Sequence, residues 1–366
     1  MEKAHFLDQQ TLAVADRQVT AKRFVIATGS QPVIPDIFGL DTVDYLTNES
    51  IFQSHEPIKH LIILGAGPIG CELAQAYARL GVRVSLVGRR SRLLPREDAD
   101  MAEIVKQQFL VDGVGLHLNT TVTEVEPAKQ GVRVCLYGED NRKNQQWLEG
   151  SHLLVATGRK PSLDSLALEK AGIELQNGHL RVDSRLRTTN KRIYACGDVV
   201  GPYLFTHMAE HQAKIVLQNA LFHLPIKVKT KGIPWCTFTS PELARVGLSE
   251  QEAQQQRIQH QIYSFPFSDI DRAITDGETV GMAKIITSPR GRILGASIVG
   301  PHAGELIAEY ALAIDRRLSL SAVSKVIHIY PTLAQINRQV ADQRLRESLT
   351  SNKKRWLKRL FGLRGQ

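Results

Sequence analysis

A glycine-rich segment, GAGPIG at residues 65–70, carries the most specific chemistry in the sequence. In the G-x-G-x-x-G spacing the first glycine permits a tight turn, the second lets the backbone approach a pyrophosphate, and the third lets a helix pack closely on a strand. Backbone amides at the start of that helix would bind the phosphates. The alternative is a glycine turn that only packs. We predict that the nucleotide contacts Gly65, Ala66, Gly67, Pro68, Ile69 and Gly70.

The residues that follow the next strand bear on which nucleotide binds. NAD-preferring sites place an Asp or Glu about 20 residues after the glycine loop, where it binds the ribose 2′-hydroxyl. Here Gly88 is followed by Arg89 and Arg90, and no carboxylate is present. Because two guanidinium groups suit a 2′-phosphate, we predict NADPH rather than NADH. The alternative is a solvated arginine pair on a loop.

The elements around the glycine loop form a β-α-β pattern. The apolar run LIIL (61–64) predicts a buried strand before the loop, and VRVSLVG (82–88) predicts a second strand. Between them, residues 71–81 have helical spacing, with Gly81 as a stop. The apolar residues that share one side of this helix are Leu73, Ala76, Tyr77 and Leu80.

Two similar segments raise a question of architecture. RFVIATGSQP (23–32) and LLVATGRKP (153–161) are both apolar runs followed by Ala-Thr-Gly and a proline, yet the sequence has one glycine-rich loop. Later segments predict short strands over 115–158, a strand that ends at Gly197-Asp198 and a helix over 207–222. Residues 232–350 predict an antiparallel sheet with helices packed on one face, after a boundary at 227–234.

Length and composition set the limits. A chain of 366 residues is expected to form two or three domains, and 43% hydrophobic with 23% charged residues is ordinary for a soluble globular protein. We expect no secretion signal and no membrane span. The net charge of +9 is concentrated in residues 351–366, so we expect no nucleic-acid partner. Cys71, Cys135, Cys196 and Cys236 have no metal-ligand spacing, which predicts a cytoplasmic location and no metal site.

In this order the motifs resemble the pyridine nucleotide-disulfide oxidoreductases, and most closely the mercuric reductase and lipoamide dehydrogenase branches. The resemblance extends to about residue 345. It implies an α/β fold, with Rossmann-like FAD- and NAD(P)-binding domains followed by an α+β dimerisation domain. The matching motifs are ATGSQP, GAGPIGCE, ATGRKP, IYACGD and TFTSPELARVGLSEQEA.

The resemblance also accounts for the two Ala-Thr-Gly segments, since they bracket the NADPH domain inserted in the FAD domain. The family's FAD fingerprint and its CxxxxC redox disulfide would precede Met1, so we expect an incomplete FAD domain. The domains implied are 1–50 and 161–228 (FAD), 51–160 (NADPH) and 229–350 (dimerisation), with 351–366 as a basic tail.

Several residues take roles from the resemblance. Asp198 is expected to bind the FAD ribitol, Gly158 to approach the nicotinamide, and Glu72 to lie beside the nicotinamide–flavin junction. The alternatives are a turn aspartate for Asp198 and an acid favoured by the helix dipole for Glu72. The other residues expected near the flavin are Thr28, Gly29, Leu204, Phe205, Thr206 and His207.

The C-terminal segment departs from the disulfide-reducing pattern, in which a His and a Glu act as acid and base for a thiol. HIYPTLAQIN (328–337) has Tyr330 at the histidine position and Gln335 at the glutamate position. Tyrosine titrates near 10 and glutamine not at all, so we expect no such dyad. His328 would share a strand face with Tyr330, as a substitute base. We expect no redox role for Cys71 or Cys196.

We therefore expect a flavoprotein of this family, with hydride transfer from NADPH to FAD and on to a sulfur or metal acceptor, impaired by the missing N-terminal part. The alternatives are a non-catalytic NADPH-binding and dimerisation module, such as half of a split protein whose partner chain supplies the rest, and a misplaced start. We expect a homodimer. In the tail, 351–366, an amphipathic basic helix predicts contact with a membrane surface, and a solvated or partner-packed helix is the alternative.

Overall fold

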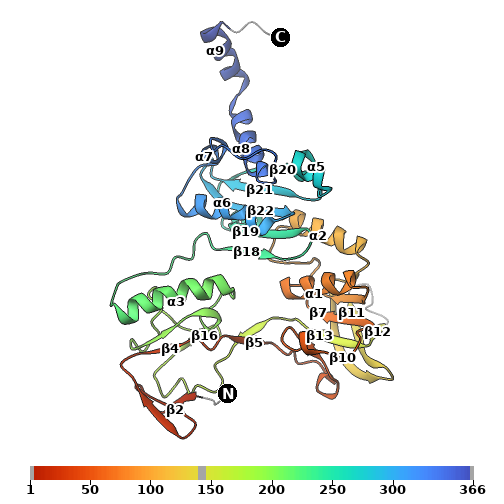
Figure 1. Cartoon of the computed structure of the whole chain (residues 1–366), viewed down its shortest axis with the longest axis vertical. Helices are drawn as coiled ribbons and strands as arrows, with labels where there is room; N and C mark the ends of the chain where they lie inside the picture. The colour runs from red at the N-terminus through yellow and green to blue at the C-terminus, as the bar shows by residue number, and fades with distance from the viewer. Residues whose placement is uncertain (1–3, 139–145, 363–366) are drawn as a thin grey trace. The chain divides into compact units, whose positions relative to one another are not determined.

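The computed structural model describes residues 4–138 and 146–362, and the chain divides into two compact units (Figure 1). The first unit comprises residues 1–35 and 157–230, and the second comprises 36–156 and 231–366. The sequence places the first change at residue 50, whereas the structure places it at residue 35. The reason is that Ile37, Leu40 and Val43 pack in a core of the second unit, and β6 (Leu46–Thr47) pairs with one of its strands.

The first unit is built on two parallel strands, β4 (Phe24–Ile26) and β17 (Ile193–Ala195), which come from opposite ends of its sequence. The 3₁₀ turn η4 (Gly197–Val199) follows β17, and helix α3 (Thr206–Leu221) packs against both. The remaining strands are β1 (Ala4–Phe6), β2 (Thr11–Val14), β3 (Arg17–Thr20), β5 (Ser30–Pro32), β14 (Arg159–Pro161), β15 (Leu175–Gln176) and β16 (His179–Leu180).

The second unit holds a five-stranded parallel sheet in the order β6-β13-β7-β8-β9. Its strands are short and apolar, because helices or strands cover both faces. The β-α-β pattern of the sequence is confirmed. The bounds are β7 (His60–Leu64), α1 (Pro68–Arg79), β8 (Arg83–Val87), α2 (Ala99–Val111), β9 (Gly115–His117) and β13 (His152–Val155), with the 3₁₀ turns η1 (Leu40–Thr42) and η2 (Ile51–Gln53) before β7.

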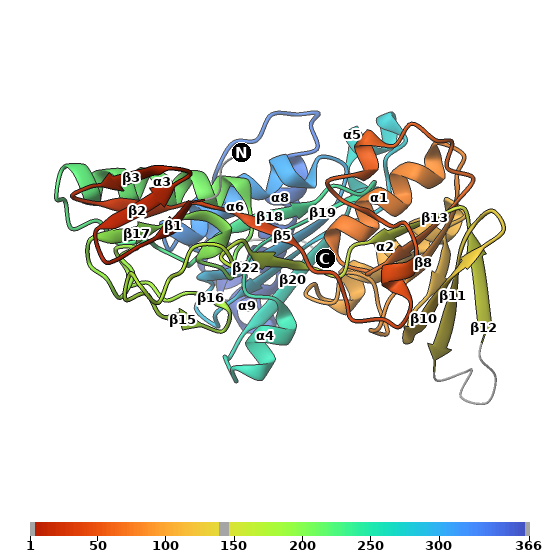
Figure 2. The same ribbon diagram turned by 90° about the horizontal axis from the view of Figure 1, so that it is seen from below.

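Alternate residues of β7 pack on opposite faces of this sheet. Leu61 and Ile63 pack with residues of α1 and α2, whereas Ile62 and Leu64 pack against a second layer of antiparallel strands. Figure 2 shows the three strands of this layer side by side. They are β10 (Thr120–Ala128), β11 (Gly131–Gly138) and β12 (Gln146–Gly150).

The buried face of α1 differs from the side that the sequence emphasises. The helix buries Gly70, Cys71, Ala74 and Gln75, while Leu80 is exposed. Leu73 and Tyr77 are only partly buried. Small residues on the buried face let α1 approach the strands closely, so the largest apolar side chains of this helix do not mark its core.

A five-stranded antiparallel sheet, in the order β18-β19-β22-β21-β20, forms the rest of the second unit and confirms the predicted α+β layer. Helices α6, α7 and α8 pack on one face, and the other face packs against α2 through Leu243 and Val299. The bounds are β18 (Pro234–Thr237), β19 (Glu242–Gly247), α4 (Glu250–Gln255), β20 (Gln261–Pro266), η5 (Phe267–Asp269), α5 (Asp271–Asp276), β21 (Met282–Thr287), β22 (Ile293–Gly300), α6 (Ala303–Asp315), α7 (Leu320–Ser324), α8 (Gln335–Ser348) and α9 (Ser351–Phe361).

A buried ion cluster joins the antiparallel sheet to the start of α2. Lys284 of β21 has a side chain only 4% exposed, and its Nζ lies 3.4 Å from Asp98 Oδ2, 2.9 Å from Asp100 Oδ2 and 2.5 Å from Glu250 Oε2. The carboxylate of Asp98 also accepts hydrogen bonds from the backbone amides of Glu250 and Gln251. Burial lowers the pKa of Lys284, but hydrogen bonds to Glu250 and Asp100 outweigh it and raise that pKa overall.

Replacing Lys284 with methionine should destabilise the second unit. Methionine retains the apolar stem but leaves the buried carboxylate of Asp98 without its cation, and breaking a buried ion pair costs about 3–5 kcal/mol. We expect Lys284→Met to lower the free energy of unfolding by about 3 kcal/mol in urea titrations. Lys106→Met, which removes an exposed pair with Glu103, is the matched control and should cost less than about 1 kcal/mol. Equal losses in the two variants would show that the cluster contributes little.

Candidate functional site

The glycine loop connects β7 to α1 and presents its backbone at the helix start. Gly65 has φ +121°, a conformation that disfavours a side chain, and a Cβ on Gly70 would lie 1.8 Å from the carbonyl oxygen of Gly65. Gly67 precedes the helix with φ −84°, and a Cβ there would meet nothing within 4 Å. The loop is therefore closed on its protein side and open at Gly67, which is the arrangement that a pyrophosphate approaching the amides requires.

The residues around the loop hold it in place. Pro68 occupies the first turn of α1, where its missing N–H costs no hydrogen bond. Ala66 is buried, and its carbonyl oxygen accepts a hydrogen bond from the Leu94 amide and a weak one from Cys71 Sγ at 3.5 Å. Ile69 is partly buried. The loop is thus braced by the segment after β8.

Gly88 directly follows β8 and is in close contact with the loop, since a Cβ there would lie 2.8 Å from Ala66 Cβ. The next two residues, Arg89 and Arg90, are exposed, and no ion pair involving either appears within residues 4–138 and 146–362. The amide of Asn119 donates to the Arg90 carbonyl oxygen, which fixes the backbone of this turn. Two guanidinium groups therefore stand beside the glycine loop and can pair with an anion.

Glu72 and Gln75 anchor α1 to the turn between β18 and β19. Glu72 Oε1 accepts a hydrogen bond of 2.8 Å from the Phe238 amide, and burial raises the pKa of this carboxyl group. Gln75 donates to the Ser240 carbonyl oxygen and accepts from the Ser240 amide, both at 2.7 Å. The position of Glu72 beside a nicotinamide stays a prediction, but the carboxylate already has a backbone partner.

In the first unit, Asp198 lies just after β17 and is half-buried. Its Oδ2 accepts a hydrogen bond of 2.5 Å from Ser30 Oγ, and Arg159 Nε donates to the same hydroxyl at 2.7 Å. Arg159 also donates to the Ser30 carbonyl oxygen at 2.7 Å. The sequence analysis did not predict a role for Ser30 or Arg159. Each directly follows one of the two Ala-Thr-Gly segments, so the repeat could have identified both.

The two Ala-Thr-Gly segments run together in this unit. Thr28 Oγ1 donates to the Ser162 carbonyl oxygen, and the amide of Ser162 donates to the Gly29 carbonyl oxygen. The amide of Val33 donates to the Gly158 carbonyl oxygen at 2.9 Å. Gly29 (φ +71°) and Gly158 (φ +140°) both have open space where a Cβ would lie. This backbone can approach a ligand without steric conflict.

The start of α3 is the other candidate flavin contact in the first unit. Leu204 and Phe205 are partly buried, while Thr206 and His207, in the first turn, are exposed. The ring of His207 stacks on Phe205 at a centroid distance of 5.2 Å. A helix N-terminus favours anions, and a half-buried carboxylate beside a hydroxyl suits the hydroxyls of a ribitol chain. The residues present therefore fit an FAD ribityl phosphate, although the expected contacts themselves stay predictions.

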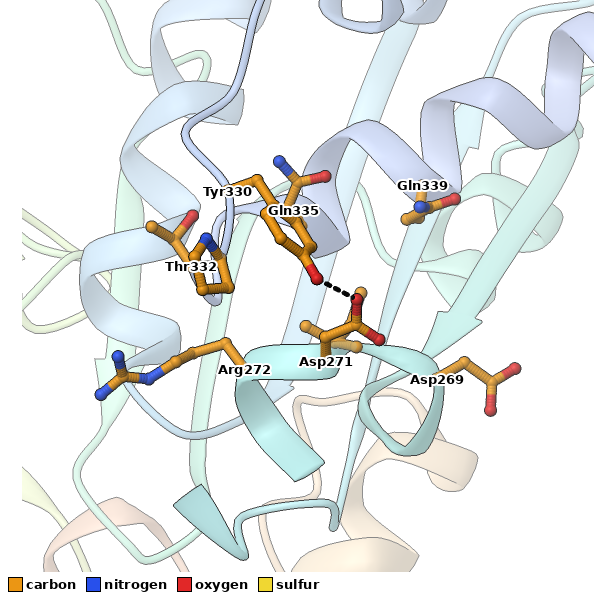
Figure 3. A pocket seen from close by; sticks show the side chains of 9 residues that line it. Asp269, Asp271, Arg272, Tyr330, Thr332, Gln335 and Gln339 are labelled. Carbon is orange, nitrogen blue, oxygen red and sulfur yellow. Dashed lines mark hydrogen bonds between the residues drawn. The ribbon is translucent and has the colours of Figure 1, made fainter. Parts of the chain in front are cut away.

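Two side chains of the C-terminal segment, Tyr330 and His328, form separate hydrogen-bonded pairs with acids of other elements. Tyr330 OH donates to Asp271 Oδ2 at 2.9 Å, a hydrogen bond that raises the pKa of the tyrosine (Figure 3). His328 Nε2 lies 3.1 Å from Glu309 Oε1. Gln335 donates to the backbone carbonyl oxygens of His328 and Ile329.

The prediction that His328 shares a strand face with Tyr330 is therefore wrong. Residues 326–332 form no strand, so their side chains do not alternate between two faces. His328 turns to α6, whereas Tyr330 turns to α5 and lines a pocket of about 110 Å³ with Asp271, Arg272 and Gln335. Asp271 gave no signal in the sequence, because nothing in its spacing relates it to Tyr330.

The cysteines and possible metal ligands offer no second centre in the described residues. Burial raises the pKa of the Cys71 thiol and of the Cys196 thiol, which opposes thiolate chemistry at either. Within residues 4–138 and 146–362 no group of three or more His, Cys, Asp and Glu side chains is placed to hold a metal ion. The same residues include no helix with the length and apolar character needed to cross a membrane.

Comparison with known proteins identifies the family that this fold and site define. The family model described as pyridine nucleotide-disulphide oxidoreductase matches residues 1–213, and the model of that family's dimerisation domain matches residues 233–340. The chain belongs to the pyridine nucleotide-disulphide oxidoreductases, which confirms the resemblance and the α/β fold class. FAD and NAD(P)H are the cofactors of this family.

Individual relatives agree with this assignment. A mercuric reductase of Bacillus cereus is 35% identical over 335 residues, which are 91% of this chain and 53% of that protein. A dihydrolipoyl dehydrogenase of Chlamydia trachomatis is 33% identical over 87% of this chain and 68% of its own length. The Cu(II) complex of the HOCl-induced flavoprotein disulfide reductase RclA from Escherichia coli has a TM-score of 0.85 and 30% identity, covering 93% of this chain and 78% of its own. The chain spans 53–61% of the mercuric reductases from Bacillus cereus and Staphylococcus aureus.

Gly67→Ala should weaken nucleotide binding without affecting the fold. The added methyl group meets no protein atom within 4 Å, but it occupies the space where a pyrophosphate would approach the amides. We expect the Kd for NADPH to rise at least about tenfold, since one lost charge-assisted hydrogen bond is worth about 1.5–3 kcal/mol. Calorimetry measures the affinity and thermal unfolding the stability.

Gly70→Ala is the contrasting variant, because its methyl group would collide with the Gly65 carbonyl oxygen and should lower Tm as well. Unchanged NADPH affinity in folded Gly67→Ala would exclude the loop as the pyrophosphate site.

Proposed function

We propose that this chain is part of an NADPH-dependent flavoprotein oxidoreductase that passes electrons to a sulfur or metal acceptor. The observation that carries the proposal is the open glycine loop at the start of α1, with Arg89 and Arg90 exposed beside it. Membership of the family supports the flavin, and the mercuric reductase relatives support the acceptor class. The preference for NADPH rests on the two arginines and the absence of an acid at the end of β8.

In this proposal the chain's residues bind and orient rather than form bonds. The amides at the start of α1 bind the pyrophosphate, and the guanidinium groups of Arg89 and Arg90 pair with the 2′-phosphate. Ser30 and Arg159 hold the carboxylate of Asp198 toward the ribitol hydroxyls. When bound, the flavin supplies the chemistry of accepting a hydride as two electrons and releasing them to the acceptor.

The C-terminal segment supports an acceptor that needs no thiol acid–base dyad. Tyr330 is held by Asp271, and Gln335, which does not titrate, binds the backbone of its own loop. Tyr330 and Gln335 also favour a second candidate function. In it the chain is a non-catalytic module that binds NADPH and dimerises, or half of a split protein with a separate partner chain. It predicts nucleotide binding without hydride transfer.

The variant Arg89→Glu with Arg90→Ala tests the proposed function and its nucleotide choice together. With FAD added under anaerobic conditions, NADPH should bleach the visible flavin band of the wild-type chain. In the variant the affinity for NADPH should fall at least about tenfold, since each phosphate contact is worth about 1.5–3 kcal/mol, while the affinity for NADH stays constant. Calorimetry measures affinity, and absorption spectroscopy follows the flavin.

Lys129→Glu with Arg290→Ala is the matched control, because it changes the net charge equally at exposed positions away from the loop. Tight NADPH binding without bleaching would favour the non-catalytic module. Equal losses of NADPH and NADH affinity in the arginine variant would refute the 2′-phosphate contact.

We also propose a homodimer, as the match to the family's dimerisation domain suggests. The apolar helix α6 is one candidate for part of the interface, but its residues Ile307 and Tyr310 are buried in the core of the same chain. The segment 326–330 is a better candidate, since Ile327 is 93% exposed and Ile329 is also exposed. The cytoplasmic location stays a prediction, based on the four cysteines that are all free thiols.

Ile327→Asp should weaken the dimer without unfolding the chain. The side chain has almost no contact within its own chain, so a charge there costs little unless a second chain covers it. Light scattering at micromolar concentration should report a dimer for the wild type and a larger monomer fraction for the variant. Val280→Asp, at another exposed apolar residue, serves as the control. A monomeric wild-type chain would contradict the proposal.

A further inference from the structure

The last helix of the described chain, α9, has two chemically opposite sides. Trp356, Leu357, Leu360 and Phe361 have i, i+1, i+4 and i+5 spacing and therefore share one side of the helix. The same spacing places Arg355, Lys358 and Arg359 on the opposite side, and Lys354, two turns before Phe361, at the edge of the apolar side.

The ends of this helix are defined by local chemistry. Thr350 Oγ1 accepts a hydrogen bond from the Lys353 amide at the start, and Gly362 ends the helix with a left-handed φ of +59°. The helix continues from α8 and extends away from the antiparallel sheet (Figure 1). Its structure is thus encoded locally rather than imposed by packing.

The apolar side of α9 is uncovered within the described chain. Trp356 is 62% exposed, Leu360 57% and Phe361 65%, and no residue of α9 is buried. No acidic residue follows Glu347 in the sequence, so α9 contains no carboxylate side chain among residues 351–361. Exposure of aromatic and aliphatic side chains to water is unfavourable. The sequence after Glu347 also contains six Lys and Arg residues, whose charges repel one another. One of the six, Arg364, lies outside the described residues.

We propose that α9 docks on the surface of an anionic lipid bilayer, lying in the plane of the interface. A basic helix with an apolar side that contains tryptophan and phenylalanine matches both parts of such a surface: acyl chains for the apolar side and anionic headgroups for the basic side. Lys353, in the first turn on the apolar side, has an apolar stem long enough to extend its ammonium group to the headgroups.

A nucleic acid or an acidic protein surface accounts for the charges but leaves the four apolar side chains unexplained. The proposal does not depend on the proposed redox function, because α9 lies outside the residues assigned to nucleotide or flavin.

Sedimentation of the full chain with vesicles tests the proposal. The protein should sediment with vesicles that contain phosphatidylglycerol and not with pure phosphatidylcholine. Binding should weaken between about 0.1 M and about 1 M salt, where the Debye length falls from about 10 to about 3 Å. The triple variant Lys354→Gln, Lys358→Gln, Arg359→Gln should lower the partition coefficient at least about tenfold.

Two matched controls separate the roles of charge and apolar area. The triple variant Lys22→Gln, Lys129→Gln, Lys227→Gln removes the same charge from exposed positions elsewhere and should bind vesicles like the wild type. On the apolar side, Leu360→Gln with Phe361→Gln should abolish binding. Leu110→Gln with Val111→Gln, an exposed apolar pair at the end of α2, should not.

The fluorescence of Trp356 provides a readout of insertion. Its emission should shift to shorter wavelength on addition of anionic vesicles, and the shift should be absent in Trp356→Phe. Equal binding to neutral vesicles, tighter binding to duplex DNA than to anionic vesicles, or loss of the dimer on deletion of residues 351–366 would each overturn the proposal.

Discussion

The second unit depends on one buried ion cluster, in which Lys284 and Arg245 of the antiparallel sheet meet the acidic start of α2. Arg245 Nε lies 3.0 Å from Glu97 Oε2, and its guanidinium group stacks on Trp235, whose Nε1 donates to Glu97 Oε1. Burial raises the pKa of Glu97, because a buried carboxylate loses its hydration. Without Arg245 and Trp235 beside it, the ionised carboxylate would therefore destabilise the fold. Buried charges tolerate few alternative arrangements, and α2 is therefore held in one register between the two sheets.

That constraint extends to the glycine loop. Helix α2 packs beside α1 in one core, and Glu72 and Gln75 tie α1 to the turn at Phe238–Ser240. The amides that face an incoming pyrophosphate sit at the first turn of the same helix. A displacement of α1 by a fraction of an ångström would alter these hydrogen bonds and the phosphate contacts together. Preorganisation of the loop thus comes both from its own hydrogen bond to Leu94 and from polar contacts of Glu72 and Gln75, one to two turns along the helix.

Features of this structure that depend on neighbouring residues can be predicted from the sequence, whereas features that depend on contacts between distant residues cannot. The β-α-β unit around 60–88 is predictable because glycine spacing and strand periodicity are local properties. The buried face of α1 is not, since its core residues are small and the amide of the buried Gln75 is satisfied by residues far along the chain, Asp112 and Ser240. Ser30, Arg159 and Asp271 likewise acquire their roles from partners distant in sequence. The boundary at residue 35 depends on the packing of the residues after it in a core of the second unit, and on the pairing of a strand of only two residues, β6, which has no periodicity to detect.

The C-terminal segment shows how two substitutions change the possible chemistry. Tyr330 and Gln335 stand where the disulfide-reducing pattern has its histidine and glutamate, and the hydroxyl proton of Tyr330 is directed to Asp271, which raises the pKa of the tyrosine. His328 is paired with Glu309, and Asn337 donates to the same carboxylate at 2.9 Å. The imidazole is therefore fixed against α6, with its Nδ1 near the carbonyl oxygen of Val326. The two side chains therefore contact different helices, Tyr330 the start of α5 and His328 α6, while Gln335 binds the backbone of the loop between them.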